Sequence, residues 1–491
     1  MRRAACGKYK GQRTKDKARE ERVKAESPNS DFVLSRFPLL SPLSLLLRPF
    51  LVLCTLHFTL CTLTSAALPL KRDSLPNGLI VLTYEDHRLP MADVALVCRS
   101  GAAFDPAGKA GTANLTANLI PKGMPGISAD SIAAIAEFLG ARLDAGADFD
   151  RSSLSMRILS KDLAAGLDLL SGSVLEPAFD PKEFRLAMDQ AMADARQRYD
   201  YPQAVVSETF DRLVFGTHPF AWSGDGDTHT LRSVNRADLV KFHKTHYVPN
   251  NCFVVAVGDI DPAALLEQVK ARFGNWQAGQ VPELTVPEMP VPHGIKARLI
   301  TRPDLNQTYI ELGHPGIAVS DSDMLDTRLM SYILGGSPMS SRMGLAVREQ
   351  GGLAYDVRCW FDRSKLRGAF HATVQTVRPK EAIELMLRDV HVMYDSGATA
   401  AEVMKAHNYY TGSFPLTYSS NRGKLMQVGA LELFRFGLDW LERFPNDVRD
   451  VTLEEVNAAA KAHLQPGDYW MVIMGPVTKE DFPIPGIEWI D

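Results

Sequence analysis

Hydrophobic residues along this chain alternate between two spacings, the two-residue period of strands and the three-to-four-residue period of helices. Apolar runs at residues 80–84, 92–98 and 253–257 predict strands, whereas the patterns at 132–139 and 181–198 predict helices. Neighbouring strands followed by helices, without strict one-to-one alternation, indicate an α+β protein. We therefore expect a mostly antiparallel sheet with helices packed on one face.

A second region with the same order follows a proline-rich break. Residues 279–295 contain four prolines and no apolar period, which predicts a linker. After it, strand patterns occur at 298–301, 308–312, 354–360 and 369–376, and helical patterns occur at 325–333, 379–394 and 399–413. The sequence thus predicts two lobes of similar architecture, at 67–278 and 296–491, preceded by a leader at 1–66.

The leader has the pattern of an export signal. Residues 50–63 form a continuous apolar run with a single histidine, and the small residues 64–67 after it suit cleavage near Ala66. The run is too short to predict a membrane-spanning helix. Residues 1–31 are unusually charged for a signal peptide, so a start site after them is an open alternative. We expect a periplasmic or secreted protein, with a mitochondrial presequence as the rival interpretation.

The composition is that of a soluble globular protein, with 45% hydrophobic and 23% charged residues. A net charge of −4 excludes a strong general attraction to nucleic acid or to an anionic membrane surface. Beyond the leader the cysteines are Cys98, Cys252 and Cys359, all within apolar strand-like runs. Because an odd number cannot pair completely, we expect three buried thiols.

Residues 101–123 read GAAFDPAGKAGTANLTANLIPKG. This segment resembles the metal-binding motif of the pitrilysin/insulinase family of inverted-motif zinc metallopeptidases, G-S-x-x-E-x-x-x-x-x-G-x-A-H-x-x-E-H. In H-x-x-E-H the two histidines share one helix face and bind zinc, and the glutamate activates the metal-bound water. Here Asn114 and Asn118 replace the histidines and Ala117 replaces the glutamate. The family's third ligand falls on or near Asp194, so the resemblance implies a degenerate site that binds no metal.

Residues 341–355 read SRMGLAVREQGGLAY and resemble a second family motif, S-R-L-x-x-x-x-R-E-x-x-G-L-A-Y. The resemblance implies that Arg348 and Tyr355 hold the substrate carbonyl and backbone, because a guanidinium and a phenol both donate to oxygen. The adjacent pair Gly351 and Gly352 predicts a helix stop, with Arg348 in the last helical turn and Tyr355 on the following strand. The structural alternative is an arginine at a helix C-terminus and a packed strand tyrosine.

Some members of this family divide the two motifs between two chains. We therefore expect a non-catalytic, substrate-binding subunit of a heterodimeric zinc metallopeptidase, inactive alone, with zinc held by an H-x-x-E-H partner and no cofactor bound by this chain. One alternative is a structural or binding protein of the same fold without a role in proteolysis. An independent hydrolase is the other, although the sequence has no nucleophile motif to support it. His243 and His246 are three residues apart but lack a third metal ligand, so we expect them to be structural.

Overall fold

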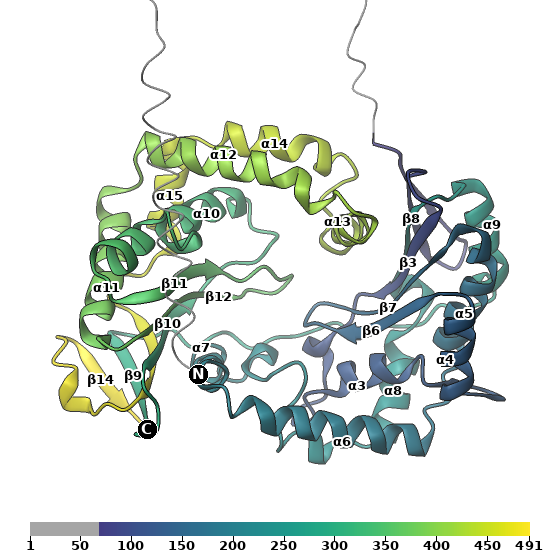
Figure 1. The fold of residues 1–491 in the computed structure, drawn as a ribbon, viewed down its shortest axis with the longest axis horizontal. Helices are drawn as coiled ribbons and strands as arrows, with labels where there is room; N and C mark the ends of the chain where they lie inside the picture. The colour runs from purple at the N-terminus through teal and green to yellow at the C-terminus, as the bar shows by residue number, and fades with distance from the viewer. Residues whose placement is uncertain (1–67) are drawn as a thin grey trace, which may run out of the picture. The chain divides into compact units, whose positions relative to one another are not determined.

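Two six-stranded sheets organise the computed structural model, which describes residues 68–491 (Figure 1). The predicted leader, its cleavage site and the alternative start lie outside the described residues. The first sheet has the order β1-β2-β8-β3-β7-β6, with β2 and β8 parallel and the other pairs antiparallel. Its strands are β1 (Leu70–Ser74), β2 (Ile80–Glu85), β3 (Met91–Cys98), β6 (Arg142–Ala147), β7 (Ser152–Leu159) and β8 (Cys252–Gly258).

The second sheet has the order β11-β12-β10-β13-β9-β14. Strand β9 pairs in parallel with β13 and β14, and the remaining pairs are antiparallel. Its strands are β9 (Ile295–Thr301), β10 (Thr308–Pro315), β11 (Ala354–Phe361), β12 (Ala369–Thr376), β13 (Tyr469–Gly475) and β14 (Ile487–Ile490). The prediction of an α+β protein with two mostly antiparallel sheets is confirmed. Strands β6 and β11 each form one edge of their sheet.

Helices in both halves begin at the signals that the sequence provides. Asp180 accepts hydrogen bonds from two backbone N–H groups at the start of α6, and Thr399 forms a capping box with Glu402 at the start of α12. The helices of the first half are α3 (Thr112–Leu119), α4 (Ala129–Phe138), α5 (Leu163–Leu175), α6 (Pro181–Arg198), α7 (Pro202–Phe215), α8 (Arg236–His246) and α9 (Pro262–Phe273). Those of the second half are α10 (Met324–Ser331), α11 (Pro379–Ser396), α12 (Ala400–Thr417), α13 (Asn421–Phe434), α14 (Trp440–Asp450) and α15 (Leu453–His463). Within residues 68–491, no helix combines the length and the apolar character needed to cross a bilayer.

Each sheet packs against helices of its own half and also against one helix of the other half. Along β8, Val254 and Ala256 join the core that contains α5 and α9, whereas the alternate residues Val255 and Val257 join Val428 of α13. In the same way, helix α7 of the first half contacts β10 and β13 of the second sheet (Figure 1). The sequence predicted only the helices on one face. The exchanged helices α7 and α13 supply the cover for the second face.

The segment between α9 and β9 contains no helix or strand, as its prolines predict. It links two halves that lie within one compact unit. The predicted boundary at 295 falls on the first residue of β9. The division into domains at 67–278 and 296–491 therefore stays a prediction.

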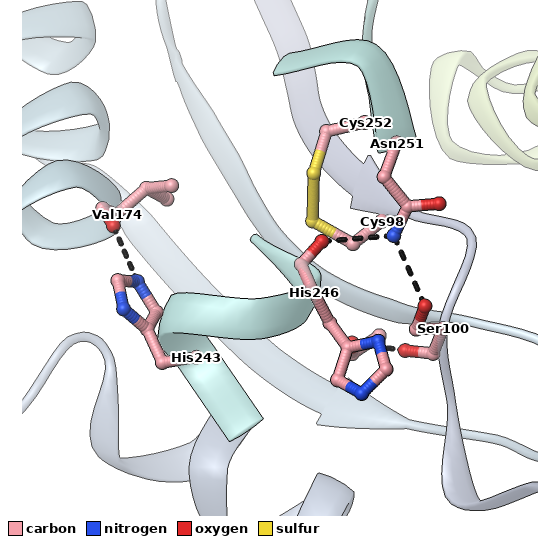
Figure 2. Close-up of a disulfide and its surroundings, with 8 residues drawn as sticks. Cys98, Ser100, Val174, His243, His246, Asn251 and Cys252 are labelled. Carbon is pink, nitrogen blue, oxygen red and sulfur yellow. Dashed lines mark hydrogen bonds between the residues drawn. A yellow bond between two sulfur atoms is a disulfide. The ribbon is translucent and has the colours of Figure 1, made fainter. Parts of the chain in front are cut away.

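A disulfide joins the centre of the first sheet, and it corrects the expectation of three free thiols. Cys98 on β3 and Cys252 on β8 are direct partners across the two antiparallel strands, and their sulfur atoms are bonded (Figure 2). The two residues are 154 positions apart in the sequence, so their proximity follows from the sheet topology and not from local spacing. Cys359 is a free buried cysteine, as expected. An apolar strand position therefore did not distinguish a paired cysteine from a free one.

Candidate functional site

The helix that carries the degenerate zinc motif keeps its geometry. Asp105 accepts hydrogen bonds from the N–H groups of Gly111 and Ala113, each at 2.7 Å, and so caps the N-terminus of α3. Asn114 and Asn118 lie one turn apart on the same side of α3, because the Asn118 amide donates to the side-chain oxygen of Asn114. The helix thus presents two amides where an H-x-x-E-H helix would present two imidazoles.

A chain of hydrogen bonds and ion pairs engages the side chain of Asn114. Its Nδ2 donates to Oδ1 of Asp225 at 2.6 Å, and Asp225 lies 3.7 Å from the guanidinium of Arg198. Arg198 also donates to Glu208 at 3.2 Å and to the carbonyl of Gly226. Asp225 and Glu208 therefore share one arginine of α6 as their ion-pair partner.

The remaining predicted members of this site are not poised for metal chemistry. Asp194 is exposed on α6 and accepts a hydrogen bond from Gln190 at 2.8 Å. Ala117 is fully buried and has no group that could accept a proton. Neutral amides and an arginine-paired carboxylate do not fit zinc, which prefers imidazole, thiolate and free carboxylate ligands. Among residues 68–491, no group of three or more His, Cys, Asp or Glu side chains is arranged to hold a metal ion.

Arg348 and Tyr355 form the second candidate site, and they lie together. Arg348 is near the end of a π-helical segment, Gly344–Gln350, and Tyr355 is the second residue of β11. The guanidinium carbon of Arg348 is 4.9 Å from the centre of the Tyr355 ring, a cation–π distance. Tyr355 is 83% exposed, so its hydroxyl faces solvent. In the described part of the chain, Arg348 makes no ion pair with a carboxylate.

Irregular backbone conformations position the side chains of Arg348 and Tyr355. Gly352 has a φ of 57°, the left-handed conformation that ends the helical segment without a side-chain clash. This confirms the predicted helix stop and the placement of Arg348 and Tyr355 on either side of it. The register of β11 against β12 shifts between Ala354 and Val357, which makes Tyr355 part of a β-bulge. Bulges and π-helical turns are both frequent beside functional sites because they redirect side chains.

A second arginine of the same motif anchors this segment. Arg342 donates two hydrogen bonds to the carboxylate of Glu402, both at 2.8 Å, and one to the carbonyl of Gly397 at 2.8 Å. Although burial raises it, hydrogen bonds from Arg342 and Thr399 hold the pKa of Glu402 at about 2. Arg342 therefore fixes the segment that carries Arg348 against α12.

The histidine pair of α8 is structural. His243 pairs with the carbonyl oxygen of Val174 at 2.8 Å (Figure 2). The His246 ring packs against Phe104 and Phe242. Burial lowers the pKa of His246 to about 4, so its imidazole is neutral at pH 7. The two side chains bind separate parts of the first-half core, in agreement with the expectation that they do not form a metal site.

The second sheet carries a buried charge cluster that no sequence pattern predicted. His371 contacts Glu311 at 2.8 Å through Nδ1 and Asp362 at 3.0 Å through Nε2, so both ring nitrogens donate. Burial lowers the pKa of His371, but the two carboxylates outweigh it and raise the pKa to about 10. Ser207 of the exchanged helix α7 donates to Glu311 at 2.5 Å. The cluster therefore links the two halves of the chain, and its residues line a cavity of about 680 Å³.

The fold and these sites define a class of protein, a two-sheet peptidase-like chain in which one motif is degenerate and the other is complete. Residues 80–221 match the family model described as Insulinase (Peptidase family M16), and residues 233–410 match the model described as Peptidase M16 inactive domain. The chain belongs to the insulinase family, peptidase family M16. Together with the degenerate motif on α3, the matches indicate a non-catalytic member of that family.

Similar proteins come from several bacteria. An uncharacterized zinc protease of Mycobacterium tuberculosis is 27% identical over 84% of this chain and 94% of its own length. The uncharacterized zinc protease YmxG of Bacillus subtilis is 22% identical over 83% of this chain and 98% of its own length. A crystal structure titled as a peptidase M16 inactive domain from Pseudomonas fluorescens superposes with a TM-score of 0.78, at 27% identity, and covers 84% of this chain and 98% of that one. A protease from Helicobacter pylori shares the fold, with a TM-score of 0.76 at 18% identity.

Proposed function

We propose that this chain is the substrate-binding subunit of a heterodimeric zinc peptidase and supplies Arg348 and Tyr355 to peptides cut by an H-x-x-E-H partner. The observation that carries the proposal is the contrast in side-chain availability between the two motifs. Asn114 and Asn118 are bound to each other, and Asn114 also donates to Asp225, whereas Tyr355 is 83% exposed. The complete motif therefore offers a guanidinium and a phenol to a substrate oxygen, whereas the degenerate motif offers neither histidine ligands nor a general base.

The edge position of β11 supports a role in holding a peptide. Strand β11 pairs only with β12 in its sheet, so its other side has unpaired backbone groups to which an extended peptide can add as a strand. Tyr355 lies on this edge strand, and Arg348 lies within contact distance of its ring. In the proposed complex the guanidinium and the phenol donate to a substrate carbonyl near the partner's reactive centre.

Hydrolysis itself is assigned to the partner. A positioned general base contributes roughly 10²–10⁴ in rate, and Ala117 stands where the family has its glutamate. Zinc would lower the pKa of a bound water toward ~7, but the donor set at Asn114 and Asn118 does not fit that metal. We therefore propose that zinc is bound by the partner and that this chain binds none.

The disulfide supports export of the protein. A cross-strand bond such as Cys98–Cys252 persists in oxidising compartments and is rare in the reducing cytosol. Together with the signal-like apolar run at residues 50–63, it favours a periplasmic or secreted location. Detection of the processed chain in a periplasmic or culture fraction would test this part of the proposal.

The decisive variants are Arg348→Ala and Tyr355→Phe, measured in a mixture with an H-x-x-E-H homologue from the same source. Loss of the guanidinium should lower kcat/KM for a peptide about 100-fold, the usual cost of removing a donor to a developing oxyanion. Loss of the phenolic hydroxyl should lower it about tenfold, equivalent to one hydrogen bond. The zinc content of the homologue should not change.

Arg443→Ala is a matched control, because Arg443 is an exposed arginine on α14, outside β11, that pairs with Asp447. It should leave the rate within about twofold, since a surface ion pair contributes little. Unchanged rates for Arg348→Ala and Tyr355→Phe would remove the role in catalysis and favour the structural alternative. A loss of zinc from the homologue would instead indicate that the variants disturb assembly.

A further inference from the structure

Three basic side chains stand between two cavities at the junction of the halves. The larger cavity has a volume of about 950 Å³ and the smaller one about 310 Å³. Arg99, Lys365 and Arg435 line both of them. Ser320 adds a hydroxyl to the smaller cavity, and none of the described residues that line it is acidic. The charged side chains that line the smaller cavity are therefore all basic, and they lie beside the apolar residues Val319, Leu433 and Phe434.

Each of the three cations comes from a different part of the fold. Arg99 follows β3 and is only 15% exposed, with its guanidinium 2.6 Å from Glu432. Lys365 lies in the turn between β11 and β12, where its backbone N–H donates to Asp150 at 3.1 Å. Arg435 ends α13 in the left-handed conformation, at φ 58°. A non-glycine residue is strained there, and such strain is common at binding sites.

Nearby acidic groups do not balance this charge. Glu432 is shared between Arg99 and Arg72, which lie 2.6 Å and 2.8 Å from its carboxylate. Asp150 accepts hydrogen bonds from Ser364 and from the backbone of Lys365. In the part of the chain that the structure describes, neither Lys365 nor Arg435 forms a side-chain ion pair.

The electrostatics of the cluster agree with an excess of positive charge. Burial and then repulsion from Arg435 and Arg72 lower the pKa of Arg99, despite the attraction of Glu432. Burial also lowers the pKa of Lys365, and Arg99 and Arg435 lower it further, against the attraction of Asp150. Cations that repel one another in a shared cavity are stabilised when an anion enters.

We propose that Arg99, Lys365 and Arg435 form a carboxylate-binding subsite that holds the C-terminal carboxylate of a bound peptide. This inference rests on the proposed function, because it requires that β11 holds a peptide. A carboxylate is the anionic group that every linear peptide carries, and charge-assisted hydrogen bonds from arginine and lysine recognise it. The smaller cavity has room for such a group and for the residue that bears it.

The position of the subsite relative to Tyr355 sets a length for the peptide. Tyr355 lies near the start of β11, and Lys365 lies in the turn after its end at Phe361. A strand rises about 3.3 Å per residue, so the two sites are separated by roughly 20 Å or slightly more along β11. A peptide aligned with this edge would place its carboxylate about six to eight residues from the residue held at Tyr355.

The test compares one labelled peptide of about ten residues, as the free acid and as the C-terminal amide, for binding to this chain alone by fluorescence anisotropy. The free acid should bind the wild-type chain at least about tenfold more tightly than the amide. Lys365→Gln and Arg435→Asn should each weaken binding of the acid and leave the amide unchanged. Asn tolerates the left-handed conformation, so Arg435→Asn should fold normally. Arg185→Gln, at an exposed arginine on α6, is the matched control and should change neither affinity.

The outcomes separate this inference from the proposed function. Equal affinity for acid and amide would overturn the carboxylate subsite, and if Arg348→Ala still weakened both peptides, the proposed function would stand. If Lys365→Gln abolished the preference for the acid and Arg348→Ala did not change binding, the subsite would stand and the role of Arg348 would be removed. If inorganic phosphate stabilised the protein in a way that required Arg435, and the acid bound no more tightly than the amide, the cavity would be assigned to a free anion. If neither the acid nor the amide bound to the chain, both proposals would be overturned.

Discussion

The two motif regions of this chain differ in what their side chains are free to do. On α3, Asn114 and Asn118 keep the one-turn spacing of a metal-binding helix, but their amides bond to each other, and Asn114 also bonds to Asp225. At the start of β11, Tyr355 is exposed and Arg348 lies against its ring. The scaffold is thus intact in both regions, while the chemistry remains available in only one. The catalytic side chains have thus been substituted while the fold that positions them has been kept.

The largest effect is expected from restoring the metal-binding side chains on α3. If only side chains were lost, Asn114→His with Asn118→His should bind stoichiometric zinc, because α3 holds both positions on one face and Asp225 bonds to position 114. Asp225 would exchange its 3.7 Å ion pair with Arg198 for the metal and become the third ligand. Zinc content after dialysis, measured by atomic absorption, is the readout. Adding Asp225→Asn should weaken the binding by about tenfold or more. A folded double-histidine variant without zinc would show that the geometry of the site has also been lost.

A smaller effect, which depends on pH, is expected when the Arg342–Glu402 ion pair that supports the second site is removed. Glu402→Gln should lower the free energy of unfolding by about 1–3 kcal/mol at pH 7, because the folded pKa of about 2 lies below the ordinary value of 4.5. A depressed acid pKa stabilises the fold fully above pH 4.5, and this contribution is lost as the pH falls toward 2. Denaturant unfolding at several pH values should show wild type and variant converging under acid conditions. A constant difference between them would contradict the role of the Arg342–Glu402 pair.

The smallest effect is expected from Asn114→Ala. It removes a partly exposed amide and its hydrogen bond to Asp225, which should cost about 1 kcal/mol or less because Arg198 still pairs with Asp225. The peptidase rate of the mixed complex should not change. A loss of rate comparable with that of Arg348→Ala would mean that the degenerate motif still takes part in substrate binding.

The order of elements followed from hydrophobic periodicity, and in places the bounds did too. Residues 181–198 and 369–376 were predicted as a helix and a strand, and they form α6 and β12 with the same bounds. Local signals were strong there, with Asp180 before the helix and the alternating apolar residues Phe370, Ala372 and Val374 in the strand. The turn at Gly352 was likewise predictable, because only the local backbone decides it.

Long-range contacts were not predictable from this one sequence. The pattern of α7 does not show that it crosses to the sheet of the other half, and β6 has too little apolar character to be recognised as an edge strand. The Cys98–Cys252 bond depends on two strands pairing across 154 residues. For the same reason the hydrogen bond from Asn114 to Asp225, and the pairing of Asp225 with Arg198, were not predicted. The Arg348 and Tyr355 pair was found because both residues lie in one continuous motif.

The central claim is that this chain contributes to peptide hydrolysis only together with a zinc-bearing partner. The most direct test measures peptidase activity and bound zinc for this chain alone, for an H-x-x-E-H homologue from the same source alone, and for their mixture. We expect activity that appears or rises only in the mixture, with zinc confined to the homologue. Stoichiometric zinc and peptide cleavage by this chain alone would contradict it, as would a mixture that shows neither association nor enhancement.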